Sequence, residues 1–275
     1  QREAVTWLNA SGLPGLEYVP IVEPLDYLIH LQIYQLGRLL FSWTAQDTYA
    51  WVSCLSGSLY AWTLWRIAAL IRPSGLERLT CFALLFSLGS LQLFFGYGES
   101  YTLVSLAVAL YLLAALRCLQ GGSLALPTLC LALACCLHLM ALALLPSGLF
   151  LLWHRRGRPW SAALQNRHRY LLLAAVGVAG LSLYVQLYPH RLPLWPAAES
   201  GKYALLSLPH ALLLFNALLL VSPFGLLWGS AVLFCRKSSS PAFVFAGWAL
   251  LGAGGLVFLH AAYLGGRDWD LRLVD

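Results

Sequence analysis

Long runs of apolar residues, separated by short polar segments, dominate this 275-residue chain. A helix that crosses a bilayer needs about 20 mostly apolar residues, and several runs approach or exceed that length. The runs are continuous and rich in Leu and Ala, whereas strands of a membrane β-barrel would alternate apolar and polar residues. The pattern therefore predicts an all-α fold, a polytopic bundle of transmembrane helices. The clearest spans are expected at 48–71, 80–96, 101–116, 170–188, 204–235 and 242–263.

The two ends of the chain are more polar than its middle. Residues 1–22 are irregular and contain glycine and proline, so we expect an outer-face segment there. From 23 to 43 the pattern is helical but includes Asp26 and His30, which suits a helix at the membrane interface or beside a protein cavity. We expect a single transmembrane domain, with its helical bundle over 23–263 and an outer-face tail over 264–275.

The stretch 127–153 is long for one span and short for two, and a Pro-Ser-Gly sequence at 146–148 interrupts it. By the positive-inside rule, the arginine cluster at 155–169 is cytoplasmic. If 127–153 crosses the membrane once, Glu99 is then cytoplasmic. If it enters and returns as two short helices, most basic residues are inside, Glu99 is outside and His138 faces a cavity. We prefer the second arrangement.

Composition supports a membrane protein. Of the residues, 60% are hydrophobic and 10% are charged, whereas a soluble domain averages about 25% charged. The seven cysteines lie in or beside apolar runs without a C-x-x-C pair, so we expect small buried residues and not a disulfide or zinc framework. The net charge of +6 does not indicate nucleic acid, because the positive charges flank the predicted spans. Leu, Ala and Arg dominate over Ile and Lys, which is typical of a GC-rich bacterial genome, so we expect a bacterial inner (cytoplasmic) membrane.

One acidic residue stands out in this apolar sequence. Glu99 is the only charged residue between Arg78 and Arg117, and it lies in the turn sequence GYGES at 96–100 between two predicted spans. A carboxylate at membrane depth is costly and indicates a functional site. The alternative is that Glu99 lies in headgroup water at the end of a helical hairpin.

Other polar residues interrupt apolar segments. Glu23 lies at a predicted helix start, and Asp26 and His30 share one helix face, which suits either a site or a capping and surface pair. His210 and Asn216 lie in an apolar segment, where an unpartnered polar group is expensive.

The tail carries Asp268 and Asp270 in a D-x-D spacing, which suits either a divalent cation such as Mg²⁺ or Mn²⁺ or a solvated turn.

The order of these elements resembles that of GT-C membrane glycosyltransferases of the protein O-mannosyltransferase and aminoarabinose-transferase type. Residues 23–38, with EPLDYLIH followed by YQLGR, are similar to the H-P-P-L-Y-Y-L-L…L-F-G segment of that superfamily. The sequence FGYGESY at 95–101 resembles its short acidic outer turn, and 137–146 resembles its broken pair of short helices. A subset of bacterial relatives is more similar still, through a P-x-H…N segment at 209–216 and an R-D-W-D-L tail at 267–271.

The resemblance implies a transferase that takes a sugar from a polyprenyl-phosphate donor at the outer membrane face. The acceptor would be a lipid, a glycan or a protein. A carboxylate would act as general base, and a divalent cation or basic residues would stabilise the phosphate leaving group. As catalytic residues it points to Glu99, which would position the substrate or a metal more than act as the main base, and to Asp26 and Glu23 as substitutes for the usual acid. As substrate-binding residues it points to His30, His138, His210, Asn216, Lys202 and Arg191, and as metal ligands to Asp268 and Asp270.

The chain departs from the family pattern at its start. Family catalysis usually rests on an acid in the first outer loop, and residues 1–22 offer only Glu3 and Glu17. The only methionine is Met140, so we expect a fragment that lacks an upstream helix. For Lys202 and Arg191 the alternative is that they are ordinary loop cations.

Two other functions stay open. In a transporter or flippase, Glu99, His138 and His210 would line a path through the membrane. In a non-catalytic GT-C-like membrane protein, the fold would be kept without the chemistry. The sequence shows no clear internal repeat, which counts against the transporter.

Overall fold

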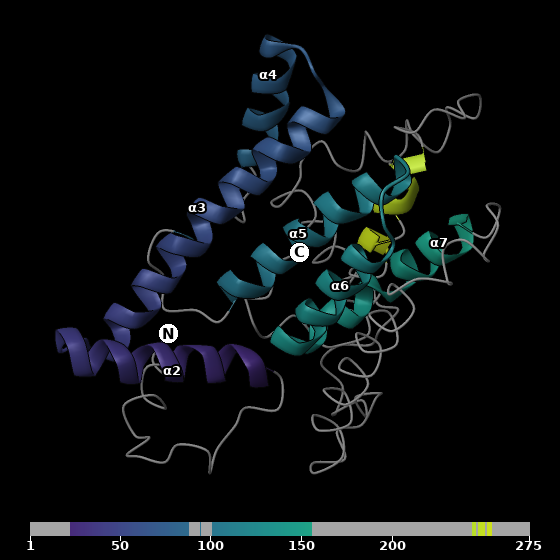
Figure 1. The fold of residues 1–275 in the computed structure, drawn as a ribbon. Coiled ribbons are helices and arrows are strands. Elements are labelled where there is room, and N and C mark those ends of the chain that lie inside the picture. Colours follow the sequence, from purple (N-terminus) through teal and green to yellow (C-terminus); the bar gives the residue numbers. More distant parts are fainter. Residues whose placement is uncertain are drawn as a thin grey trace, which may run out of the picture.

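The computed structural model describes residues 23–87, 94, 101–155, 244–245, 247–250 and 252–254. Over these ranges the regular structure is entirely helical and contains no strand, which confirms the all-α class. The helices are α2 (Pro24–Phe41), α3 (Ala45–Ile71), α4 (Gly75–Phe86), α5 (Tyr101–Leu119), α6 (Ala125–Leu137) and α7 (Leu145–Arg155), with a 3₁₀ helix η2 (Leu139–Leu144) before the last (Figure 1). The end segments 1–22 and 264–275 and the spans expected at 170–188 and 204–235 lie outside the described residues.

Helices α3 and α5 are long and apolar enough to cross a membrane. Helix α3 begins with a capping box: Thr44 Oγ1 accepts from the backbone N–H of Asp47 at 3.2 Å, and the Asp47 carboxylate accepts from the backbone N–H of Thr44 at 2.8 Å. The two helices pack side by side and run parallel. Their C-terminal ends are adjacent, because the Gln120 side chain donates to the carbonyl of Leu70 at 3.4 Å. The bounds of α3 and α5 agree with the spans predicted at 48–71 and 101–116 to within three residues.

The stretch that follows α5 enters the bundle and turns back. Helix α6 runs antiparallel to α5, so that His138 at its end lies beside Tyr101 at the start of α5, with ring centroids 5.3 Å apart. Further along the chain, Ser147 bonds Tyr111, which lies about 15 Å higher on α5. The chain has therefore reversed direction after His138. The residues from α6 to α7 therefore form a helical hairpin whose two arms both contact α5.

The interruption in this stretch lies earlier than the sequence indicates. We expected it at the Pro-Ser-Gly sequence of 146–148, but helix α6 already ends at Leu137. His138 then has an extended backbone, with φ −155° and ψ 134°, and the chain continues as η2. Pro146 lies in the first turn of α7, where a missing backbone N–H removes no helical hydrogen bond. The proline thus belongs to a helix start.

Helix α4 corrects the span expected at 80–96. It begins earlier, at Gly75, and ends at Phe86, with Ser87 as its C-terminal cap. Phe94 lies in a 3₁₀ turn, so the region is not one continuous α-helix. Helix α4 packs back on α3 through Phe82, whose ring meets Trp65 edge to face at 5.5 Å.

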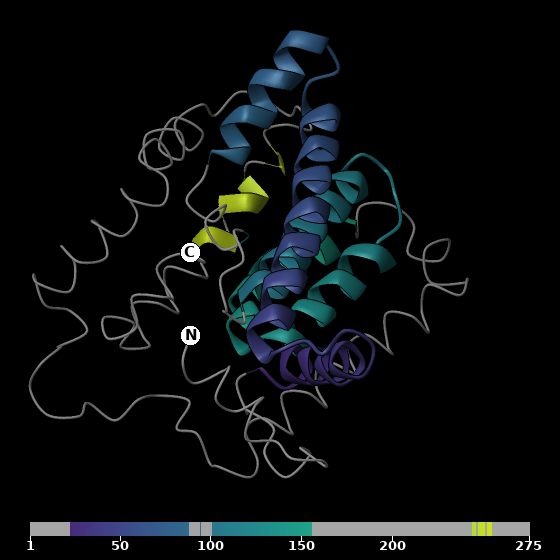
Figure 2. The same ribbon diagram turned by 90° about the vertical axis from the view of Figure 1, so that its left-hand side faces the viewer.

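Helix α2 lies across one end of the bundle, and α4 projects at the other end (Figures 1 and 2). The chain turns from α2 into α3 through Ser42, which has a left-handed backbone with φ 57°. The Trp43 ring packs over Gly37 so closely that a Cβ atom at Gly37 would overlap it. This contact fixes the angle between the two helices.

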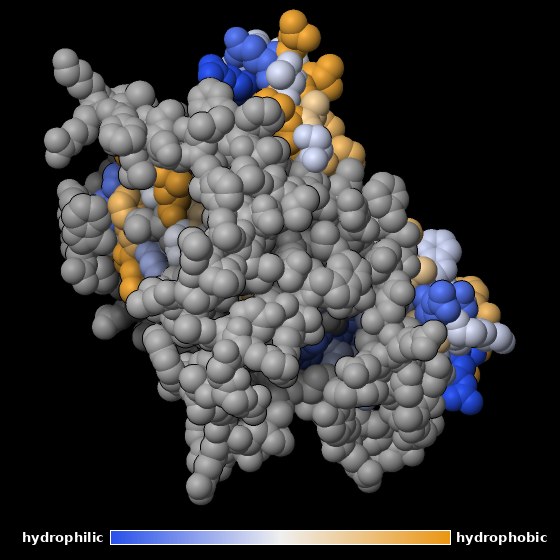
Figure 3. All heavy atoms as spheres, turned by 180° about the vertical axis from the view of Figure 1, so that it is seen from behind, coloured by the Kyte–Doolittle hydropathy of each residue, from blue (hydrophilic) through white to orange (hydrophobic). Residues whose placement is uncertain are grey.

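Large apolar side chains are exposed on outward faces of the described helices, such as Leu55, Leu59 and Trp62 on α3. Figure 3 shows strongly hydrophobic and strongly hydrophilic residues side by side at the projecting α4 end. Extensive exposed apolar surface marks an interaction face with membrane or protein. Together with the two spanning-length helices, it supports membrane association.

None of the described cysteines forms a disulfide. Cys118, Cys135 and Cys136 are buried in the helical core, as the sequence predicts. Cys54 differs, because its side chain is exposed on α3. Cys235 lies outside the described residues.

Candidate functional site

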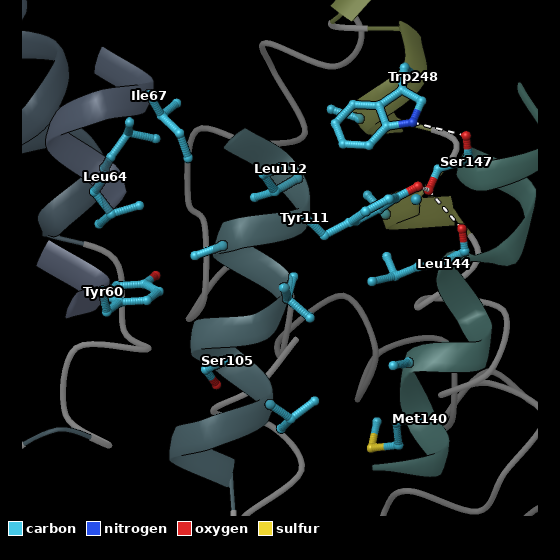
Figure 4. Close-up of a pocket in the computed structure, with 18 of the residues that line it drawn as sticks. Tyr60, Leu64, Ile67, Ser105, Tyr111, Leu112, Met140, Leu144, Ser147 and Trp248 are labelled. Atoms are coloured by element: carbon cyan, nitrogen blue, oxygen red, sulfur yellow. Dashed lines mark hydrogen bonds between the residues drawn. The ribbon is translucent and has the colours of Figure 1, made fainter. Parts of the chain in front are cut away.

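A cavity of about 410 Å³ lies between α3, α5, η2 and the described part of 244–254 (Figure 4). At one end it is bordered by Tyr101, His138 and Met140, and at the other by Ile67 and Leu112. Because α5 rises about 1.5 Å per residue, Tyr101 and Leu112 are separated by about 17 Å along the cavity. The lining is mostly apolar, and its polar side chains are Tyr60, Tyr101, Ser105, Tyr111, His138 and Ser147.

A hydrogen-bond network joins three segments at the cavity wall. The Ser147 hydroxyl donates to the carbonyl of Leu144 at 2.6 Å, so the Tyr111 hydroxyl donates to Ser147 Oγ at 2.8 Å. The Trp248 indole N–H donates to the Ser147 carbonyl at 2.9 Å. These bonds link α5, the start of α7 and the helical segment at 247–250 (Figure 4). This network is not predictable from the sequence, in which its only signals are a serine after Pro146 and a tryptophan in an apolar run.

His138 is the predicted site residue that borders the cavity. Its Nδ1 accepts a hydrogen bond from the backbone N–H of Met140 at 3.1 Å, which caps η2. A ring nitrogen that accepts a hydrogen bond carries no proton, so the imidazole is neutral with its proton on Nε2. The tilted ring of Tyr101 lies beside it. His138, which is 2% exposed, thus presents a neutral N–H donor to one polar end of an apolar cavity.

Asp26 and His30 form a buried pair on the inner face of α2. His30 Nδ1 lies 3.0 Å from Asp26 Oδ2 and 3.0 Å from the backbone carbonyl oxygen of Asp26. The imidazole stacks on the Tyr49 ring of α3 at 4.1 Å. The side chains are 1% and 0% exposed, and neither Asp26 Oδ1 nor His30 Nε2 has a hydrogen-bond partner. Of the two expectations for this pair, the exposed surface pair is wrong, because both side chains are buried.

Folding raises the pKa of both Asp26 and His30. Burial raises the pKa of the Asp26 carboxyl, and the hydrogen bond and charge of His30 only partly oppose this. Burial lowers the pKa of the His30 ring, but the hydrogen bond and negative charge of Asp26 outweigh burial, so the pKa of His30 is raised overall. The charge of Glu23, the residue before α2, adds to that rise. The folded pair therefore holds its protons to a higher pH than the unfolded chain does.

The structure brings Asp26, His30 and His138 to the same end of the bundle, opposite Arg72 and Arg117. His30 stacks on the start of α3, and His138 lies at the start of α5. Asp26 and His30 do not border the cavity, so they are not in contact with its contents. The other predicted site residues lie outside the described residues: Glu99, Arg191, Lys202, His210, Asn216, Asp268 and Asp270. Among the residues that the structure describes, no cluster of three His, Cys, Asp or Glu side chains suits a metal ion.

Comparison of the chain with protein-family models, with curated proteins and with solved structures finds no match.

Proposed function

We propose that this protein is an integral membrane glycosyltransferase. It transfers a sugar from a polyprenyl-phosphate donor to a lipid, glycan or protein acceptor at the outer face of a bacterial inner membrane. The observation that carries the proposal is the position of His138, a neutral imidazole at one mouth of an apolar cavity that follows α5 through the bundle. The resemblance to GT-C transferases supplies the reaction class.

The cavity suits the isoprenoid part of such a donor. Its volume of about 410 Å³ is within the usual range of about 300–1,000 Å³ for ligand sites. Leu64, Ile67 and Leu112 line the end that lies away from His138, where an apolar chain loses water without leaving a polar group unpaired. The phosphate and sugar would then remain at the polar mouth beside His138 and Tyr101.

The chemistry at that mouth is a single displacement. The acceptor hydroxyl oxygen forms a bond to the anomeric carbon of the sugar, and the bond from that carbon to the phosphate oxygen breaks. The polyprenyl phosphate leaves with the electron pair, and a carboxylate takes the hydroxyl proton. Glu99 is the proposed carboxylate, since Asp26 is buried in its pair with His30 and does not border the cavity. The His138 N–H donates to a phosphate or sugar oxygen.

The distribution of charge favours this orientation in the membrane. Arg66, Arg72, Arg78 and Arg117 all belong to the end where the C-termini of α3 and α5 meet. By the positive-inside rule that end is cytoplasmic. The end with His138 and α2 is then the outer one, where a lipid-linked sugar donor would be used.

The proposal is tested by sugar transfer in proteoliposomes that contain the full chain and radiolabelled polyprenyl-phosphate sugars. We expect Glu99→Gln to lower the transfer rate at least about 100-fold, as loss of a general base does. We expect His138→Asn to lower it about tenfold, because asparagine keeps an acceptor for the Met140 N–H but lacks the Nε2 donor.

His154→Gln, an exposed histidine on α7, is the matched control and should leave transfer unchanged. Equal activity of Glu99→Gln and the parent protein would remove Glu99 from the mechanism. Movement of the intact donor across the membrane without transfer to any acceptor would overturn the proposal in favour of a flippase.

A further inference from the structure

The end of the bundle opposite His138 carries a patch of three arginines, Arg66, Arg72 and Arg78, and two of them lie on tryptophan rings. The Arg66 guanidinium lies 5.6 Å from the centre of the Trp62 ring, and the Arg78 guanidinium lies 5.5 Å from that of Trp65. Arg78 comes from α4 and Trp65 from α3, so the second contact joins the two helices. Stacking on tryptophan holds a guanidinium at a fixed place while leaving its edge N–H groups available.

The patch has more positive charge than its neighbours neutralise. Arg72 lies 3.9 Å from Glu77, but this is a loose contact between side chains that are 61% and 60% exposed. The Arg78 guanidinium donates one hydrogen bond, to the Pro73 carbonyl, at 2.6 Å. Glu77 is the only acid in the segment 48–98, which contains Arg66, Arg72 and Arg78. A guanidinium cluster with one partly engaged acid is complementary to an anion, and phosphate is the anion that arginine binds best.

The surroundings of the patch point to a lipid. Leu55 and Leu59 are exposed on α3 below Trp62, and Leu76 and Leu79 are exposed on α4. Trp62 is 51% exposed, and a half-exposed tryptophan is typical of the boundary between acyl chains and headgroups. An apolar helix surface that ends in tryptophan and arginine matches one phospholipid: acyl chains along the helix and an anionic headgroup at the arginines.

We propose that Arg66, Arg72 and Arg78, together with Trp62 and Trp65, bind the headgroup phosphate of an anionic phospholipid in the cytoplasmic leaflet. This site rests on the membrane placement of α3 and not on glycosyl transfer, so it stands if the chain proves to be a transporter. The occupant is a phospholipid of the bulk membrane. It is distinct from the sugar donor, whose cavity opens at the opposite end.

The test is native mass spectrometry of the detergent-solubilised full chain, titrated with dioleoyl phosphatidylglycerol or with dioleoyl phosphatidylcholine. We expect the parent protein to bind phosphatidylglycerol at least about tenfold more tightly, since its headgroup has a net negative charge and that of phosphatidylcholine does not. The triple variant Arg66→Gln, Arg72→Gln, Arg78→Gln should lose most of this preference. Glu77→Gln should increase it, because it removes the negative charge that lies beside Arg72.

Arg38→Gln is the matched control, because Arg38 is an exposed arginine on α2 at the other end of the bundle. It should change the preference less than about twofold. The single variants Arg66→Gln and Glu77→Gln decide the question if the triple variant does not fold. Equal affinity of the parent protein for the two lipids would overturn the proposal, as would an equal loss in Arg38→Gln or a weaker preference in Glu77→Gln.

Discussion

The hydroxyl of Tyr111 on α5 donates a hydrogen bond of 2.8 Å to Ser147 Oγ at the start of α7. Both side chains are almost completely buried, at 1% exposure each. The bond closes the returning arm of the 125–155 hairpin onto the helix that it left. It also places a fixed polar group in the wall of the cavity, next to Gly148, where only a small residue fits against Leu131 and Tyr111.

Removal of that hydroxyl should loosen the returning arm. We expect Tyr111→Phe to lower the free energy of unfolding by about 1–2 kcal/mol, because a buried hydrogen bond is lost and Ser147 keeps its bond to Leu144. Tyr34→Phe, at a half-buried tyrosine of α2, is the control and should change stability by less than about 0.5 kcal/mol. Thermal unfolding in detergent measures both. Equal shifts in the two variants would contradict a structural role for the Tyr111–Ser147 bond.

The buried Asp26–His30 pair should make stability fall as pH rises. The pKa of each group is raised on folding, so the folded chain binds more protons than the unfolded chain at and above the usual range of histidine. The stability from His30 is therefore complete below its unfolded pKa of 6.5 and is lost as pH rises through the higher folded pKa.

The measurement is the difference in unfolding free energy between the parent protein and His30→Gln across that pH range. We expect the parent's advantage to be largest at about pH 5.5 and to shrink by about pH 9. Asp26→Asn should reverse this pH dependence, because the charge that raises the His30 pKa is gone and burial then lowers that pKa. If the stability difference between the parent protein and His30→Gln grew with pH, burial and not Asp26 would have the larger effect on the pKa of His30.

The contact between Gly37 and Trp43 should tolerate no side chain at Gly37. Gly37→Ala places a methyl group against the indole ring, which costs about 1–3 kcal/mol of stability as overpacking does. In the Trp43→Ala background, Gly37→Ala should cost much less, because the ring that it meets is gone. The double variant should therefore lose less stability than the sum of the two single losses. Gly75→Ala, where a Cβ meets open space, is the control. Additive losses from Gly37→Ala and Trp43→Ala would contradict the contact.

Filling the cavity should block the lipid donor without unfolding the chain. Val108 is a half-buried residue of α5 that lines the cavity, and Val108→Phe puts an aromatic ring into its space. We expect binding of undecaprenyl phosphate to weaken at least about tenfold, since a ligand that fills an apolar pocket loses its contacts. Leu129→Phe, on the exposed face of α6, should leave binding unchanged. An equal affinity in both variants would place the lipid elsewhere.

The sequence predicts the parts of this fold that depend on local pattern. Continuous apolar runs predict α3 and α5, since length and composition alone decide whether a helix can span a bilayer. The i, i+4 spacing of Asp26 and His30 places them on one helix face, and the structure brings the two groups into contact. Their burial under Tyr49 is not predictable, because it depends on how α2 lies across α3.

Features that depend on contacts between distant parts of the chain are not predictable from the sequence. The bond from Trp248 to Ser147 joins residues that are 101 positions apart, so neither residue signals the other. The helix break at His138 is set by the Nδ1 cap on Met140, whereas the sequence draws attention to the proline. Helix α4 begins at Gly75, directly after its N-terminal cap Ser74. This start was not predicted, because the residues around it show no regular spacing of apolar positions.

The most direct test of the central claim is photocrosslinking of a polyprenyl phosphate with a photoreactive group near the far end of its chain. The full chain is illuminated with this probe in liposomes, and the labelled peptides are identified by mass spectrometry. If the isoprenoid lies in the cavity below His138, labels fall on the cavity-facing residues Leu64, Ile67 and Leu112, and unlabelled undecaprenyl phosphate competes with them. Labels confined to the outward residues Leu55 and Leu59, unaffected by the competitor, would contradict the account.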